Sequence, residues 1–103
     1  MPKLILIPEA PCIVEGNKQL VPMPFAKWVE ATIDLYGESG HGLANIKRAL
    51  RLVEKASQAN GSLTIDIEDH KFLVAAMNAA EFSPRFARAT LPYFEAVDSA
   101  KEV

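Results

Sequence analysis

The stretch LANIKRALRLVEKASQANGSLTI, residues 43–65, contains a helix, a turn and a strand in succession. The apolar residues of its first part are spaced three or four apart: Leu43, Ile46, Leu50 and Val53. This spacing predicts an amphipathic helix over 43–59 with its apolar stripe turned toward a core. The Asn-Gly pair that follows can cap the helix, and residues 62–67 then alternate between apolar and polar, as in a half-buried strand. The stretch therefore indicates a fold of the α+β class.

Extended structure is expected before this helix. A short apolar run at 4–7 is closed by prolines, and two strand-like segments flank Gly16-Asn17, a pair suited to a tight hairpin turn. We therefore expect a β-ribbon over 3–22. From Pro24 to Tyr36 the apolar period becomes helical, and three glycines in the loop 37–42 end that helix.

Two further helices are expected after the strand. One should run over 68–80, and the other over 84–101, with Ser83 as its N-cap and a break at Pro92. The predicted fold is α+β: an N-terminal β-hairpin or ribbon plus a short strand, packed against four helices. All 103 residues should form one helix-dominant domain.

Charge and composition argue against several classes of protein. Eleven basic and thirteen acidic side chains give a net charge of −2, which disfavours a chain-wide grip on nucleic acid or anionic lipid. The single cysteine, Cys12, cannot form a disulfide within one chain. No apolar run reaches the roughly 20 residues that a membrane span needs, and the run at 4–7 is too short for a signal-peptide core. We expect a soluble cytoplasmic protein with no membrane contact.

Asp66, Glu68, Asp69 and His70 are the candidate metal ligands, since carboxylates and an imidazole can together bind a divalent ion. The three acids also stand where a helix should begin, and free backbone amides and the helix dipole favour negative charge there. We interpret them as helix-capping residues and expect neither a metal nor a cofactor.

Nucleophilic catalysis and phosphate binding are also disfavoured. Cys12 is far in sequence from both histidines, and Ser39 beside His41 is not part of a G-x-S-x-G elbow. The glycine loop 37–42 leads into a helix, but phosphate-binding loops follow a strand and this one follows a predicted helix. The chain is therefore expected not to be an enzyme.

A row of cations marks the helix 43–59. Lys47, Arg51 and Lys55 recur every four residues, with Arg48 beside them. Three interpretations stay open: a solvated or internally ion-paired face, a surface for an acidic protein, and a nucleic-acid surface in a helix-turn-helix-like arrangement.

Apolar residues are in surplus near the C-terminus. In a small domain most aromatic side chains belong to the core, but an excess at a chain end is a recurrent docking surface. The expected partner-binding anchors are Phe86, Leu91, Tyr93, Phe94 and Val97. The expected charged rim is Lys47, Arg48, Arg51 and Lys55.

The layout of the whole chain adds a resemblance. The segments that carry it are Pro22-Met23-Pro24-Phe25, Gly42-Leu43, Leu63-Thr64-Ile65-Asp66, Ser83-Pro84-x-Phe86 and Leu91-Pro92-Tyr93-Phe94. Over nearly its full length the chain resembles small proteins encoded by tailed bacteriophages and prophages, although Phe82-Ser83 stands where those proteins tend to have Tyr-Asn. The resemblance implies a non-enzymatic viral protein, either a virion or assembly component or a factor aimed at the host, and it implies no site residues.

These observations predict a small interaction protein that binds another protein, viral or from the bacterial host, through its helices, with self-association as a further option. The alternative is binding to nucleic acid or to host transcription machinery through the basic helix 43–59. The expected location is the cytoplasm of the bacterial host or the virion itself.

Overall fold

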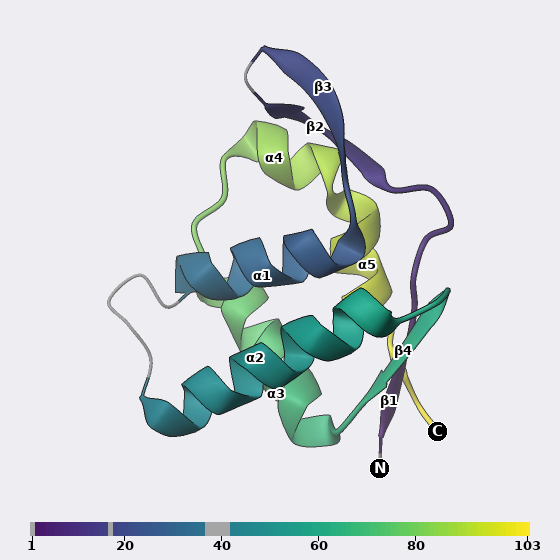
Figure 1. Cartoon of the computed structure of the whole chain (residues 1–103), viewed down its shortest axis with the longest axis vertical. Helices are drawn as coiled ribbons and strands as arrows, with labels where there is room; N and C mark the ends of the chain where they lie inside the picture. Colours follow the sequence, from purple (N-terminus) through teal and green to yellow (C-terminus); the bar gives the residue numbers. More distant parts are fainter. Residues whose placement is uncertain (1, 17, 37–41) are drawn as a thin grey trace.

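Five helices and five short strands make up the part of the chain that the structure, a computed structural model, describes: residues 2–16, 18–36 and 42–103 (Figure 1). The helices are α1 (Phe25–Tyr36), α2 (Leu43–Gln58), α3 (Ile67–Ala79), α4 (Pro84–Ala89) and α5 (Leu91–Asp98). The strands are β1 (Lys3–Leu6), β2 (Cys12–Gly16), β3 (Gln19–Met23), β4 (Ser62–Ile65) and β5 (Lys101–Glu102). The fold is α+β, as the sequence predicts.

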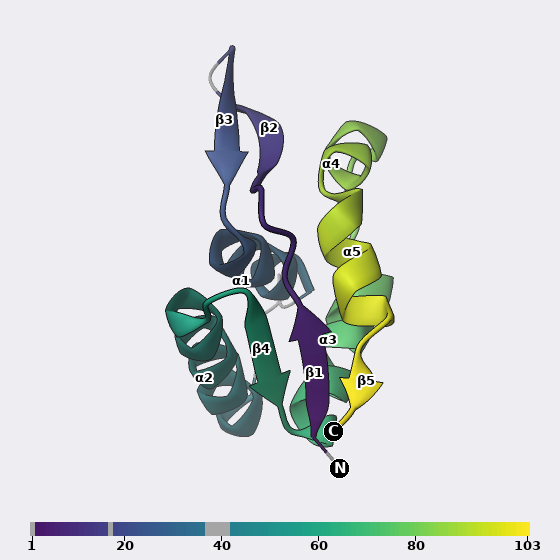
Figure 2. The same cartoon turned by 90° about the vertical axis from the view of Figure 1, so that its right-hand side faces the viewer.

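The strands form two antiparallel sheets rather than one N-terminal ribbon. β2 and β3 pair as a hairpin, whereas β1 is the central strand of a second sheet with the order β4-β1-β5. Leu4 of β1 stands opposite both Thr64 and Lys101. Figure 2 shows β4, β1 and β5 side by side, with the hairpin projecting beyond them. The expected ribbon over 3–22 is split because the apolar run of β1 pairs with β4, far along the chain.

Two turns use backbone conformations that most residues avoid. Gly16 pairs with Gln19, so the hairpin turn lies one residue later than predicted, and Lys18 takes a positive φ of 66° there. Gly61, with φ 82°, turns the chain from α2 into β4, and its carbonyl accepts a 2.9 Å hydrogen bond from the Ile7 amide.

The burial of α1 follows its predicted stripe, but α2 is rotated relative to the prediction. Leu52 of α2 is completely buried, whereas Leu50 is 67% exposed and Ile46 is also exposed. The rotation follows from two arginines, Arg48 and Arg51, which point at α3 and pair with a buried carboxylate there. The apolar stripe expected to face the core therefore lies partly on the surface.

The C-terminal segment differs from one long helix with a break at Pro92. α4 ends at Ala89, Thr90 caps both helices, and Pro92 lies in the first turn of α5, where its missing amide proton costs nothing. α5 ends at Asp98 rather than 101, because β5 pairs with the backbone of β1. The N-cap prediction is confirmed: the Ser83 hydroxyl accepts a hydrogen bond from the Phe86 amide at 3.2 Å.

An aromatic cluster joins α1 to α5 in the centre of the core. Trp28 is fully buried and its ring lies 5.7 Å from that of Tyr93 and 5.0 Å from that of Phe94. Phe25 stacks on Trp28 at 5.6 Å. The radius of gyration of 13.1 Å is close to the value of about 13 Å for a compact domain of this length. None of the helices within the described ranges has the length and apolar character to cross a bilayer.

Candidate interaction surfaces

The five predicted apolar anchors do not form one surface. Tyr93 and Val97 are 1% and 0% exposed, so they are core residues and are not available as anchors in this conformation. Phe86 and Phe94 are half-buried, and Leu91 is 49% exposed at the start of α5. The aromatic surplus has a structural use that sequence reasoning missed, because α5 must cover α1, β1 and the base of the hairpin together.

The buried Tyr93 connects α5 to both strands of the hairpin. Its hydroxyl accepts a 3.1 Å hydrogen bond from the amide of Cys12 and donates a 2.6 Å hydrogen bond to the carbonyl of Met23. Cys12 and Met23 face each other at the base of the hairpin. Burial raises the pKa of the Tyr93 hydroxyl, which keeps it protonated and able to donate.

Of the candidate nucleophiles, Cys12 lies within the described residues. Cys12 is buried, as expected of a lone cysteine, and burial raises the pKa of its thiol, which favours the unreactive protonated form. Ser39 and His41, with the glycine loop between 37 and 41, lie outside the described residues.

The basic row of α2 is divided between solvent and the protein interior. Arg51 donates to both carboxylate oxygens of Asp69, from Nη2 at 2.8 Å and from Nε at 3.3 Å. Arg48 Nε lies 3.1 Å from the same carboxylate, as an ion pair without hydrogen-bond alignment. Lys47 is exposed and Lys55 half-buried. The internally ion-paired interpretation therefore holds for two of the four predicted rim cations.

Asp69 itself is fully buried on α3, and its two arginines offset the cost of removing its charge from water. Its hydrogen bond to Arg51 raises the pKa of that guanidinium. The capping prediction is wrong in part. Asp66 is the N-cap of α3, yet its side chain makes no capping hydrogen bond.

The expected absence of a metal concerns the same segment. His70 Nε2 lies 2.9 Å from the carbonyl oxygen of Val97, and Asp69 is engaged by arginines. Among residues 2–16, 18–36 and 42–103 no group of three or more His, Cys, Asp or Glu side chains could hold a metal ion. Asp69 and His70 therefore connect α3 to α2 and α5, whereas Asp66 and Glu68 are exposed.

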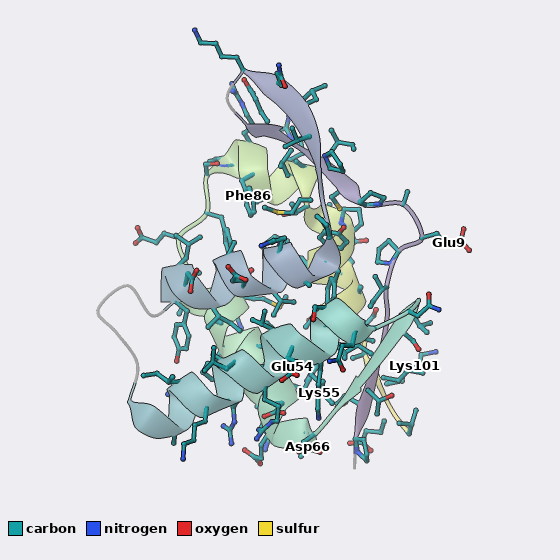
Figure 3. All side chains as sticks on the ribbon, viewed as in Figure 1. Glu9, Glu54, Lys55, Asp66, Phe86 and Lys101 are labelled. Atoms are coloured by element: carbon teal, nitrogen blue, oxygen red, sulfur yellow. The ribbon has the colours of Figure 1, made fainter. Side chains whose placement is uncertain are left out.

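Apolar side chains line a hollow on each side of α1, and most of them are half-buried. On one side lies a shallow hollow of about 530 Å³, here named the α1–α4 hollow. Its apolar lining is Ala31, Leu35, Phe82 and Phe86. Asp34 and Glu81 stand at its rim, and neither forms an ion pair with another described residue. Figure 3 shows Phe86 on the side of α4 that faces α1.

On the other side of α1, the groove toward α2 holds a second hollow of about 350 Å³, here named the α1–α2 hollow. Its apolar lining is Ile33, Ala49, Leu50 and Val53. Glu30 and Asp34 line its α1 wall. Figure 1 shows α1 and α2 lying side by side and running in opposite directions.

Of the predicted anchors, Phe86 lines the α1–α4 hollow, and the two hollows add Leu35, Phe82 and Leu50, which sequence reasoning assigned to no site. Leu50 could have been recognised only by asking which way Arg48 and Arg51 must point. Their common target on α3 is a tertiary fact, invisible in the pattern of α2.

Comparison with protein-family models, with curated proteins and with solved structures finds no match to this sequence.

Proposed function

We propose that this chain is a small protein-interaction protein without a catalytic centre, a phage-encoded virion, assembly or accessory component that binds another protein through its helices. The observation that carries the proposal is the α1–α4 hollow, in which apolar side chains of α1 and α4 meet at the surface. The resemblance to phage-encoded proteins suggests that the partner is viral or comes from the bacterial host.

The chemistry of the hollow specifies the kind of partner. Leu35 is 44% exposed on its wall, and each Å² of apolar surface removed from water contributes roughly 25 cal/mol to binding before the costs of association. Asp34 and Glu81 place negative charge at the rim. A partner segment with an aliphatic or aromatic side chain next to Lys or Arg would fit both features.

Nucleic-acid binding has less support. Arg48 and Arg51 already neutralise Asp69, so the row on α2 offers less positive charge than its sequence suggests. Glu30 and Asp34, which line the α1–α2 hollow beside this row, would repel phosphates. These two facts favour a protein as the partner.

Site-specific photocrosslinking tests the proposal. A photoreactive amino acid replaces Leu35 in the full chain, in cells that carry the phage or prophage genome encoding it. The matched control carries the same group at Leu20, a 76% exposed leucine on the hairpin. We expect one discrete adduct from position 35, weakened by the double charge reversal Asp34→Lys and Glu81→Lys, and no such adduct from position 20. Adducts of equal pattern from both positions, or none from position 35, would contradict the proposal.

A further inference from the structure

We infer that the partner binds through an amphipathic basic helix that lies across α1 and reaches the α1–α4 and α1–α2 hollows at once. The inference rests on the proposed function, because it concerns the same foreign partner and adds the second hollow to its site. The residue that carries it is Asp34. This one carboxylate lines both hollows, so the two are neighbours on either side of α1.

Carboxylates lead from one hollow to the other across α1. Glu30 lines the α1–α2 hollow, Glu81 lines the α1–α4 hollow, and Asp34 lines both. All three are exposed, and none forms an ion pair with another residue of the described ranges. A segment that covers them must supply cations, because removing an unpaired carboxylate from water is costly.

The cations nearby do not balance these acids. On α1 and α2, the exposed charges without an ion-pair partner among the described residues are Lys27, Glu30, Asp34, Lys47 and Glu54. With Glu81 they make four acids and two bases, a local net charge of −2. A second copy would bring the same acidic excess to this face, whereas a basic segment brings the opposite charge.

The separation of the two hollows fits two turns of a helix. The hollows lie on opposite sides of α1, and a helix with its side chains is about 10–12 Å across. In a partner helix, residues i and i+7 lie about 10.5 Å apart on one face, with i+3 and i+4 between them. Apolar residues at i and i+7 then enter the two hollows, and a cation between them meets Asp34. In an extended segment the residues on one side recur every ~6.6 Å, which offers no such set of three.

Crosslinking from both hollows is the first test. Each hollow has an exposed leucine in its lining, Leu35 at 44% and Leu50 at 67%. The photoreactive amino acid replaces Leu35 in one variant and Leu50 in another, in the full chain and in the same cells as above, and mass spectrometry maps the crosslinked residues of the partner. We expect both positions to capture one segment of one protein, at residues about seven apart with Lys or Arg between them.

Charge reversal is the second test. Asp34→Lys should weaken the adducts from both positions at least about tenfold, because the new cation faces the partner's cation whichever hollow carries the crosslinker. Replacing that partner cation by Glu should restore both adducts. The matched control is Glu9→Lys, at an exposed acid that points away from α1 (Figure 3), and it should leave both adducts unchanged. Circular dichroism checks that each variant is folded.

The outcomes separate this inference from the proposed function. Absence of an adduct from position 35 contradicts both. An adduct from position 35 alone, or different proteins or distant segments captured from the two positions, leaves the proposed function standing and overturns the inference. Capture of a second copy of this chain, or adducts that Asp34→Lys leaves unchanged, would overturn it as well.

Discussion

The hydroxyl of Tyr93 donates a 2.6 Å hydrogen bond to the carbonyl oxygen of Met23. The two residues lie in elements far apart in the sequence, α5 and the last position of β3, and the same hydroxyl accepts the amide of Cys12 across the hairpin. A two-stranded hairpin is marginally stable by itself in water. The structure holds the base of this hairpin through the buried Tyr93 hydroxyl, and Arg85 of α4 pairs with Glu15 of β2 at 2.9 Å nearer the hairpin's tip.

Tyr93→Phe should lower the free energy of unfolding by about 2 kcal/mol, because the ring still packs while a buried amide and a carbonyl lose their partner. Urea denaturation measures this loss. Ser99→Ala is the matched control: it removes an exposed hydroxyl at the end of α5 and should change stability by less than about 0.5 kcal/mol. Equal stability of Tyr93→Phe and wild type would show that the hydrogen bonds contribute nothing.

Alkaline pH should weaken the wild type more than Tyr93→Phe. Burial raises the pKa of Tyr93 in the folded chain, so the folded state holds this proton more tightly than the unfolded state does. This difference in pKa stabilises the folded state fully when the pH is below the ordinary pKa of tyrosine, about 10. The stabilisation is lost as the pH rises through the pKa that Tyr93 has in the folded chain. Burial also raises the pKa of the Cys12 thiol, so alkaline pH weakens the fold through Cys12 as well. Because wild type and Tyr93→Phe both contain Cys12, this effect is common to the two proteins.

Urea midpoints between about pH 8 and 11 measure this effect. The difference between wild type and Tyr93→Phe should narrow as pH rises, since only the wild type has the buried phenol. A difference that is constant over this range would contradict the assignment of the effect to Tyr93.

Asp69→Asn should destabilise the fold by roughly 1–3 kcal/mol, because two arginines lose the charge they pair with. The loss stays below that of a fully buried pair, since the side chains of Arg48 and Arg51 are 34% and 47% exposed and water can solvate them. Arg51→Gln should cost less than Asp69→Asn, because Arg48 remains beside the carboxylate. Lys47→Gln, an exposed cation of the same helix with no ion pair among the described residues, is the control and should be neutral. A loss as large for Lys47→Gln as for Asp69→Asn would contradict this account.

Features set by neighbouring residues could be predicted from the sequence. Ser83 caps α4, Gly61 ends the turn after α2, and the stripe of α1 including Trp28 faces the core, because each depends on local backbone geometry or on one helical period. The α+β class follows from the same local signals.

Features set by distant partners could not be predicted. β5 contains only Lys101 and Glu102, and it is a strand only because β1 offers an edge beside it. Tyr93 was predicted to be a partner-binding anchor, because no residue near it in sequence indicates that its hydroxyl hydrogen-bonds to Cys12 and Met23. The candidate surfaces depend on the same kind of information, since a hollow exists only between elements.

Helix α2 shows this limit most directly, and a matched pair of substitutions tests it. The spacing of its apolar residues favoured Leu50 as a core residue, yet Leu52, two positions later, is fully buried instead. Leu52→Ala should therefore cost about 2–5 kcal/mol, the range for a buried leucine whose removal leaves a cavity. Leu50→Ala should cost less than about 0.5 kcal/mol, because its side chain is already largely in water. A larger loss for Leu50→Ala than for Leu52→Ala would mean that Leu50 faces the core, as the spacing of apolar residues in α2 suggests. In that case the ion pairs of Arg48 and Arg51 with Asp69 would not set the rotation of α2.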